Sequence, residues 1–167
     1  MSSNEPLLPR LQRGVSDSAQ ATQRLGQRLA SHVVPGMVIS LDGTLGAGKT
    51  CLAKGLVAEL AGVSPDEVTS PAYSLVKEYG NPLRVAHMDF YRFTELDGAD
   101  AEVLEEYFLD RAVTVVVEWG AKFIQHFTRD YLQIVIDYGD DDDSRILDLI
   151  EHGRPRSGSL SLESLLS

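Results

Sequence analysis

Residues 38–50 read Val38-Ile39-Ser40-Leu41-Asp42-Gly43-Thr44-Leu45-Gly46-Ala47-Gly48-Lys49-Thr50, and this stretch decides the fold. It begins with β-branched and apolar residues that are typical of a buried strand, and a helical pattern follows it. Residues 43–50 match G-x-x-x-x-G-K-[ST], the phosphate-binding loop (P-loop) of nucleoside triphosphatases. Glycines let successive backbone N–H groups turn toward phosphate oxygens, and the helix N-terminus adds further unpaired N–H groups. Lys49 would add a positive charge and Thr50 a hydroxyl ligand for Mg²⁺, so the stretch predicts binding of a nucleoside triphosphate.

Composition narrows the class of protein further. The chain has 167 residues, of which 43% are hydrophobic, and this suits one globular domain. No apolar run approaches the roughly 20 residues of a membrane span, and residues 1–6 lack the pattern of an export signal. A single cysteine, Cys51, excludes an internal disulfide and fits a reducing compartment. We therefore expect a cytoplasmic protein with no membrane contact.

The net charge of the chain is −10. Such acidity opposes direct binding to the phosphates of nucleic acids, because that binding relies on clustered Lys and Arg. It does not oppose nucleotide binding, because the loop amides and Mg²⁺ supply local positive potential. Any role with RNA is therefore expected to run through a partner protein.

Periodicity along the chain predicts alternating helices and strands, and hence an α/β fold. Residues 1–15 have no period and predict a flexible N-terminal arm, and the Ser-, Gly- and Leu-rich residues 154–167 predict a flexible C-terminal tail. Residues 16–153 form the predicted domain. Helices are expected at 17–34, 50–61, 121–127 and, as short acidic pieces, within 94–107; strands are expected at 37–41, 74–79, 83–88, 113–117, 131–138 and 145–151, with the second and third as a hairpin.

Two carboxylates follow predicted strands directly. Asp89 ends one strand, and Glu118 follows the continuous apolar run at residues 113–117. Because ligands of open α/β sheets sit beyond the carboxyl ends of the strands, both side chains are candidates for the site. Structural alternatives stay open, since Asp89 could cap the turn before Phe90. Glu118 could instead pair with Arg92 or Arg111.

Other candidates carry weaker signals. The polar residues 69–74 suit either a loop that closes over Mg²⁺ and the γ-phosphate or an ordinary connection. Trp119 could stack on a base or on a partner, or pack in the core. His87 lies two residues before Asp89 and could reach the site, although the pattern favours a core histidine. The acidic residues 94–107 suit a solvated helix face better than a docking surface for a basic partner, and residues 139–144 suit a hairpin turn better than a metal loop.

Taken together, these motifs resemble the TsaE (YjeE) family. The resemblance rests on the P-loop, Ser70-Pro71-Ala72-Tyr73-Ser74-Leu75-Val76, His87-Met88-Asp89-Phe90-Tyr91-Arg92 and Val116-Val117-Glu118-Trp119, and it extends from residue 17 to about residue 151. It implies a P-loop NTPase-like three-layer fold with a central mixed sheet. It also implies a slow ATPase that binds ATP or ADP and Mg²⁺. Such a protein would support TsaB and TsaD in forming N6-threonylcarbamoyladenosine at position 37 of tRNA.

The resemblance also implies roles for residues of this chain. Thr50 and Glu118 would bind Mg²⁺, and Asp89 would orient or deprotonate the attacking water. Lys49 would neutralise phosphate charge during the reaction. The nucleotide contacts would be Thr22, Gly46, Ala47, Gly48, Lys49, Thr50 and Cys51, and Trp119 is a further candidate from its own position after Glu118.

This chain departs from the family pattern at four positions. The family usually has Asp at Thr44, Thr or Ser at Cys51, Thr at Ala72 and Pro at Gly120. Ala72 matters most, because a family threonine that contacted Mg²⁺ or the γ-phosphate would be missing here. The change at Ala72 therefore bears on the rate of hydrolysis and not on nucleotide binding.

Two other functions stay open on the sequence alone. A small-molecule kinase would transfer the phosphoryl group to an acceptor, but such enzymes usually bring several arginines, and here the arginines after the loop are scattered. A non-catalytic module would use nucleotide only to control docking. A GTPase switch is disfavoured further, since the chain contains neither N-K-x-D nor D-x-x-G.

Overall fold

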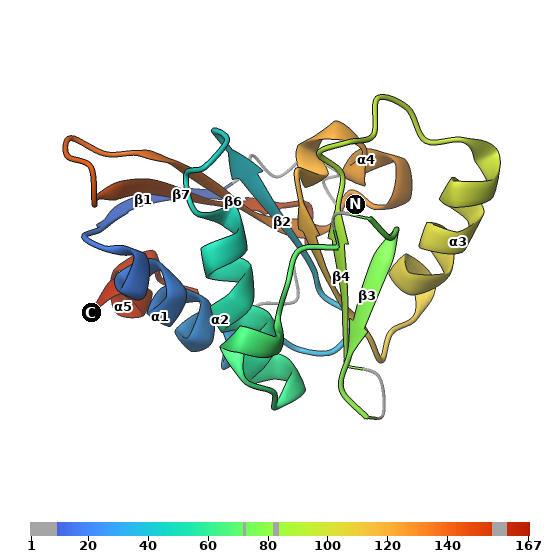
Figure 1. The fold of residues 1–167 in the computed structure, drawn as a ribbon, viewed down its shortest axis with the longest axis horizontal. Helices are drawn as coiled ribbons and strands as arrows, with labels where there is room; N and C mark the ends of the chain where they lie inside the picture. The colour runs from blue at the N-terminus through green and yellow to red at the C-terminus, as the bar shows by residue number, and fades with distance from the viewer. Residues whose placement is uncertain (1–9, 72, 82–83, 155–159) are drawn as a thin grey trace, which may run out of the picture.

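The computed structural model describes residues 10–71, 73–81, 84–154 and 160–167. Seven strands form one mixed sheet in the order β1-β7-β6-β2-β5-β4-β3, with helices on both faces (Figure 1). The predicted three-layer α/β fold with a central mixed sheet is confirmed. The strands are β1 (Arg10–Ser16), β2 (Val38–Gly43), β3 (Val76–Tyr79), β4 (Val85–Asp89), β5 (Thr114–Glu118), β6 (Tyr131–Tyr138) and β7 (Arg145–His152). The helices are α1 (Ala19–Ala30), α2 (Lys49–Ala61), α3 (Gly98–Leu109), α4 (Ile124–Phe127) and α5 (Leu162–Leu166), with short 3₁₀ turns η1 (Pro65–Glu67) and η2 (Gly120–Lys122).

The four central strands run parallel and place three chain segments at one edge of the sheet. β2 pairs in parallel with β5 and β6, and β4 pairs in parallel with β5. In this register Glu118 lies opposite Leu41 of β2 on one side and Asp89 of β4 on the other. The residues that follow β2, β4 and β5 therefore meet at the carboxyl edge, the usual ligand position in such sheets.

Each face of the sheet has its own hydrophobic core, because successive strand residues point to opposite faces. In β2, Ile39 and Leu41 pack with α1, α2 and α5, whereas Val38 packs with α3 and α4. Figure 1 shows the corresponding two groups of helices. The fully buried side chains of the first core include Leu25, Leu29, Leu52 and Leu56, and those of the second include Met88, Phe90, Leu104 and Ile124.

Helices α1 and α2 touch through two glycines. A Cβ atom on Gly26 would lie 2.3 Å from the Leu52 carbonyl oxygen, and one on Gly55 would lie 2.0 Å from that of Gln23. This close approach brings the two backbones together beneath β2. Because it depends on the absent Cβ atoms, the pair sets how α2, and with it the P-loop, sits on the sheet.

Gly26→Ala is expected to lower the free energy of unfolding by about 2 kcal/mol, measured by urea denaturation. Overpacking costs about 1–3 kcal/mol, and the better helix propensity of alanine returns less than about 1 kcal/mol. The matched control is Gly98→Ala in the first turn of α3, where the new methyl group meets no atom within 4 Å. Equal stability of the Gly26 variant and the wild type would contradict this packing argument.

Both predicted flexible ends need correction within the described residues. Residues 10–16 are strand β1, which pairs antiparallel with β7 from Arg10 opposite Glu151 to Ser16 opposite Arg145. The end of the chain is also ordered, since Leu160, Leu162 and Leu165 are buried. Gln12 joins the two segments, because it donates to the Leu160 carbonyl (2.8 Å) and accepts from the Leu162 N–H (2.8 Å). Residues 1–9 and 155–159 lie outside the described residues.

Smaller differences concern helix boundaries. The acidic stretch forms one helix, α3, rather than several short ones, and its N-cap Asp97 accepts from the Asp100 N–H (2.8 Å). The hairpin of β3 and β4 is confirmed as an antiparallel pair.

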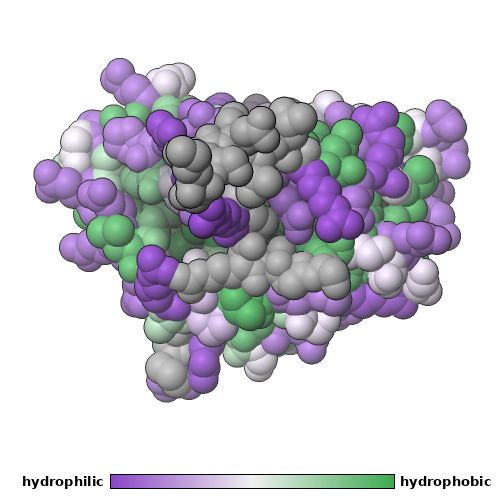
Figure 2. Space-filling model, turned by 180° about the vertical axis from the view of Figure 1, so that it is seen from behind, coloured by the Kyte–Doolittle hydropathy of each residue, from purple (hydrophilic) through white to green (hydrophobic). Residues whose placement is uncertain are grey.

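On the face shown in Figure 2, hydrophobic and hydrophilic residues are interspersed outside the grey atoms. That part of the surface therefore shows no single large hydrophobic patch.

Candidate functional site

The P-loop lies between the end of β2 and the start of α2. Gly43, Gly46 and Gly48 all have positive φ angles, of 120°, 77° and 117°, which side chains with a Cβ atom rarely adopt. A Cβ atom on Gly43 would also lie 1.9 Å from the Ile136 carbonyl oxygen. Gly48 caps α2 without a side-chain hydrogen bond. The first N–H groups of α2 are therefore available to an anion beside the loop.

Lys49 is folded back onto the loop. Its side chain is buried, and Nζ donates to the carbonyl oxygens of Gly43 (2.9 Å) and Thr44 (2.6 Å). Nζ also lies 4.0 Å from the centre of the Trp119 ring, a cation–π contact. Burial lowers the pKa of the Lys49 ammonium, while nearby carboxylates, led by Glu118, act in the opposite direction. The loop thus holds a cation on its own carbonyl groups.

Thr50, Glu118 and His87 form a connected set of hydrogen bonds. The Thr50 hydroxyl donates to Glu118 Oε2 (2.7 Å), and His87 Nε2 lies 3.0 Å from Glu118 Oε1. Glu118 and His87 are both buried. Because an ionised carboxylate only accepts, Nε2 of His87 carries the proton in this contact. Glu118 therefore pairs with Thr50 and His87 rather than with Arg92 or Arg111, and His87 is a buried residue that also contacts the site.

The Thr50–Glu118 pair suits a hard cation. Two oxygens 2.7 Å apart from a hydroxyl and a carboxylate are the kind of ligands that Mg²⁺ takes from proteins, with water and phosphate oxygens completing its shell. Within residues 10–71, 73–81, 84–154 and 160–167 there is no group of three or more His, Cys, Asp or Glu that could hold a metal ion by itself. The donor set therefore fits a cation bound together with a phosphate ligand.

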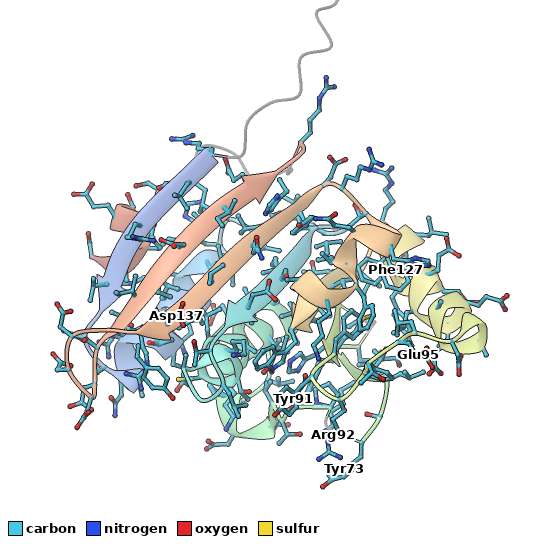
Figure 3. All side chains as sticks on the ribbon, turned by 90° about the horizontal axis from the view of Figure 1, so that it is seen from above. Tyr73, Tyr91, Arg92, Glu95, Phe127 and Asp137 are labelled. Carbon is cyan, nitrogen blue, oxygen red and sulfur yellow. The ribbon has the colours of Figure 1, made fainter. Side chains whose placement is uncertain are left out.

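Asp89 lies beside this pair at the end of β4. Its Oδ1 accepts from the Tyr91 N–H (2.9 Å) and its Oδ2 from the Ser70 hydroxyl (2.8 Å). Asp89 thus caps the turn after β4 and contacts the 69–74 loop as well. In Figure 3, Tyr73, Tyr91 and Arg92 lie close together in this region, and Arg92 stacks 4.6 Å from the centre of the Tyr73 ring. Ala72 lies outside the described residues.

A cavity of about 300 Å³ connects these groups at the carboxyl edge. It brings together seven of the predicted site residues. Its lining consists of Leu45, Gly46, Gly48, Lys49, Thr50, Asp89, Tyr91, Glu118 and Trp119.

Three predicted nucleotide contacts do not line this cavity. Thr22 is buried beside Gly48, and its hydroxyl bonds to the Ser16 hydroxyl (2.7 Å). Ala47 is buried. The Cys51 thiol donates to the Ala19 carbonyl (3.1 Å), and burial raises its pKa. Cys51 therefore has a packing role in this structure.

The base of the β6–β7 hairpin also contacts the P-loop, a contact that no local pattern predicts. Asp137 accepts from the backbone N–H and the hydroxyl of Thr44. The Tyr138 hydroxyl donates to the Leu45 carbonyl (3.0 Å), and Arg145 Nε donates to the Ala47 carbonyl (2.9 Å). An aspartate in place of Thr44 would face the Asp137 carboxylate and be repelled by it. Threonine, which donates a hydrogen bond to Asp137, is therefore the more compatible residue at this position in this chain. Figure 3 shows Asp137 near the end of β6.

A three-layer α/β fold with this loop at the end of a central strand, β2, defines the class of P-loop-like α/β proteins. Within that class, the chain belongs to the TsaE family, because residues 16–147 match the family described as "Threonylcarbamoyl adenosine biosynthesis protein TsaE". The resemblance predicted from the motifs is therefore confirmed.

Individual relatives agree with this assignment. The chain is 37% identical over 128 residues to the tRNA threonylcarbamoyladenosine biosynthesis protein TsaE of Bacillus subtilis, covering 76% of this chain and 78% of that protein. It is 39% identical over 110 residues to the protein of the same name from Treponema pallidum, covering 66% and 79%. The crystal structure of Bacillus subtilis YdiB superposes with a TM-score of 0.68 at 30% identity, covering 87% and 88%.

Over the part of the chain that the structure describes, every helix is too short or too polar to cross a membrane.

Proposed function

We propose that this protein is a Mg²⁺-dependent ATPase that supports the TsaB–TsaD complex in forming N6-threonylcarbamoyladenosine at position 37 of tRNA. The single observation that carries the proposal is the cavity at the carboxyl edge. It brings Lys49, the Thr50–Glu118 pair and Asp89 to one space beside the P-loop. These are the groups that phosphoryl transfer to water requires, namely a phosphate-binding cation, oxygen ligands for a metal and a carboxylate that positions the nucleophile.

Substrate binding would exchange hydrogen bonds within the loop. The β- and γ-phosphates of ATP would accept from the N–H groups of the P-loop and of the first turn of α2. Lys49 would leave the carbonyl oxygens of Gly43 and Thr44, 2.9 and 2.6 Å away, and donate to phosphate oxygens instead. The four-carbon stem of lysine allows this movement without a change in the backbone.

The same cavity offers a place for the metal. Thr50 and Glu118 would hold Mg²⁺, directly or through water, and the ion would neutralise charge on the β- and γ-phosphates. His87 fixes the second oxygen of Glu118 (3.0 Å). A histidine N–H on a ligating carboxylate keeps it oriented, as outer hydrogen bonds do in metal sites.

Asp89 would position the attacking water. One carboxylate oxygen already bonds to the Tyr91 N–H, which holds the side chain in place. The other bonds to the Ser70 hydroxyl (2.8 Å), and a water molecule could replace that hydroxyl. Among the described residues that line the cavity, Lys49 is the only cationic side chain. Kinases usually hold their acceptor with several arginines, so we assign water as the acceptor.

The acidic surface bears on the partners. With a net charge of −10, the protein would meet tRNA only through the TsaB–TsaD complex, since free RNA repels it. It would act in the cytoplasm, where that substrate is available.

The proposal is tested with purified protein, γ-labelled ATP and Mg²⁺, with and without TsaB and TsaD. We expect slow release of inorganic phosphate in step with ADP, a faster rate with the partners, and loss of the modified adenosine in cells depleted of the protein. Label on a small acceptor would support a kinase instead. Nucleotide-dependent binding to the partners without hydrolysis would support a docking module, and normal tRNA modification after depletion would contradict the proposal.

A further inference from the structure

Asp42 is a buried carboxylate directly before the P-loop that the proposed reaction does not use. It is 6% exposed. Its Oδ2 accepts from the Ser40 hydroxyl (2.6 Å) and from Gln133 Nε2 (2.9 Å), and its Oδ1 accepts from the Ala121 N–H (2.9 Å). Within the described chain it makes no ion pair at salt-bridge distance. A carboxylate that is buried without a cationic partner is unfavourable. The three hydrogen bonds from Ser40, Gln133 and Ala121 must therefore offset that cost.

Its partner Ala121 lies in the turn that follows Glu118. In that turn Trp119 has φ 59° and ψ 31°, and it is the one residue other than glycine with a positive φ in the described chain. Such a conformation is unfavourable for a residue with a Cβ atom and persists only where the surroundings fix it. The turn therefore needs restraints from outside its own sequence.

The end of β2 supplies those restraints at three points. The Trp119 N–H donates to the Leu41 carbonyl (2.8 Å), and the Ala121 N–H donates to Asp42. Between them, Gly120 packs so closely that a Cβ atom on it would lie 2.3 Å from the Ser40 hydroxyl oxygen. Among the described residues, Asp42 is the one side chain outside the turn that accepts a hydrogen bond from it, and Ser40 contacts both Asp42 and the Gly120 position.

The restrained turn sets the position of the Trp119 ring. The ring centre lies 5.0 Å from that of Tyr91 and 4.0 Å from Lys49 Nζ. All three residues line the cavity. A shift of the turn would move the indole away from the ammonium group and open the position that Lys49 occupies.

We propose that Asp42 is a positioning residue, which fixes the turn after Glu118 so that the Trp119 ring lies against Lys49. The step from ring position to nucleotide affinity rests on the proposed function, whereas the step from Asp42 to Trp119 does not. The two steps are therefore measured separately.

Trp119 is the only tryptophan in the chain, so its fluorescence reports this turn directly. Without nucleotide, Asp42→Ala should shift the emission to longer wavelength and increase quenching by acrylamide. The positioning role requires the indole to stay against Lys49 when the ammonium group donates to the phosphates, so losing this cation–π contact should weaken binding of ATP with Mg²⁺ by about fivefold.

Asp42→Asn separates geometry from charge. Asparagine keeps an oxygen for the Ala121 N–H, and the Ser40 hydroxyl and Gln133 amide can turn to accept from its amide nitrogen. This variant should therefore fluoresce as the wild type does. If it behaves like Asp42→Ala, the charge of Asp42 acts on Lys49 directly and the positioning role is wrong.

Two further variants complete the design. Ala121→Pro removes the donor but leaves Asp42 intact, and proline is tolerated in the first turn of a helix; it should reproduce the fluorescence change, and it decides the question if Asp42→Ala does not fold. Asp148→Ala breaks the bidentate bond to Arg13 (2.7 Å for each contact) elsewhere on the sheet and should leave Trp119 unchanged. Folded Asp42→Ala and Ala121→Pro proteins with wild-type fluorescence would overturn the proposal. A wild-type protein that binds no ATP would instead overturn the proposed function.

Discussion

Lys49→Ala is expected to weaken ATP binding by at least about 100-fold, which corresponds to about 3 kcal/mol. A hydrogen bond to a charged group contributes about 1.5–3 kcal/mol, and Lys49 would make more than one to the phosphates. Its removal also leaves carboxylates without their cation, because Glu118, Asp42, Asp137 and Asp89 all act on the Lys49 ammonium. The site would then repel a triphosphate. Isothermal titration calorimetry with ATP and Mg²⁺ measures the loss.

Two variants control for indirect effects. Lys49→Gln keeps a donor for the loop carbonyls but carries no charge, so it should lose affinity as well. Lys54→Ala changes a lysine of the same helix outside the cavity lining and should bind as the wild type does. A dissociation constant for Lys49→Ala within about threefold of the wild type, a change of less than 1 kcal/mol, would remove Lys49 from the binding site.

The parts of the site that could be predicted are those with a local signal. The P-loop motif fixes the strand, the loop and the helix together, and each of Asp89 and Glu118 directly follows an apolar strand. The rule that parallel strands end at a common edge then brings the two carboxylates together. The register confirms that placement, with Asp89 opposite Glu118. Their chemical roles remain predictions.

The parts that could not be predicted depend on contacts between distant residues. β1 shows no alternating pattern, because its outward-facing Leu11 and Val15 are 57% and 58% exposed while polar Gln12 faces inward to the C-terminal segment. In Figure 3, no helix lies in front of this part of the sheet. Its pairing with β7 joins residues at opposite ends of the chain. An edge strand of this kind has little local signature.

The link between Asp42 and the turn at Trp119 could not be predicted for a similar reason. Local propensity argues against tryptophan in a left-handed conformation, and the turn exists because β2 holds it. The bond by which Asp42 holds the turn joins residues 79 positions apart, and its bond to Gln133 joins residues 91 positions apart. Sequence reasoning could place Trp119 near the site but could not find the residue that orients it.

The polar groups of the site bond to one another in this structure. Lys49 bonds to loop carbonyls, Thr50 to Glu118 and Asp89 to Ser70. Nucleotide and metal would have to replace these bonds with comparable ones, so part of the binding energy offsets the bonds lost. In the proposed function, this exchange would slow the unassisted reaction, and a partner would accelerate it by stabilising the rearranged site.

Asp89→Asn is expected to lower the rate of ATP hydrolysis by about 100-fold or more, because positioned general bases contribute about 10²–10⁴-fold. Asparagine keeps an oxygen for the Tyr91 N–H, which Asp89 holds at 2.9 Å, and its amide can donate to Ser70. The turn after β4 should therefore persist, and affinity for ATP should stay close to that of the wild type. Asp89→Ala should lose turnover in the same way. It should also be less stable than Asp89→Asn, because the turn after β4 loses the side chain that caps it.

Phosphate release and nucleotide affinity are measured for each variant with the TsaB–TsaD complex present, so that the stimulated rate is compared. Asp100→Asn is the matched control, since Asp100 lines the neighbouring groove together with Asp89 but lies outside the phosphate cavity. It should hydrolyse ATP at the wild-type rate. Unchanged turnover in Asp89→Asn would remove Asp89 from the mechanism and leave its bond to the Tyr91 N–H as its role. Lost turnover together with lost affinity would mean that the carboxylate shapes the cavity rather than positions water.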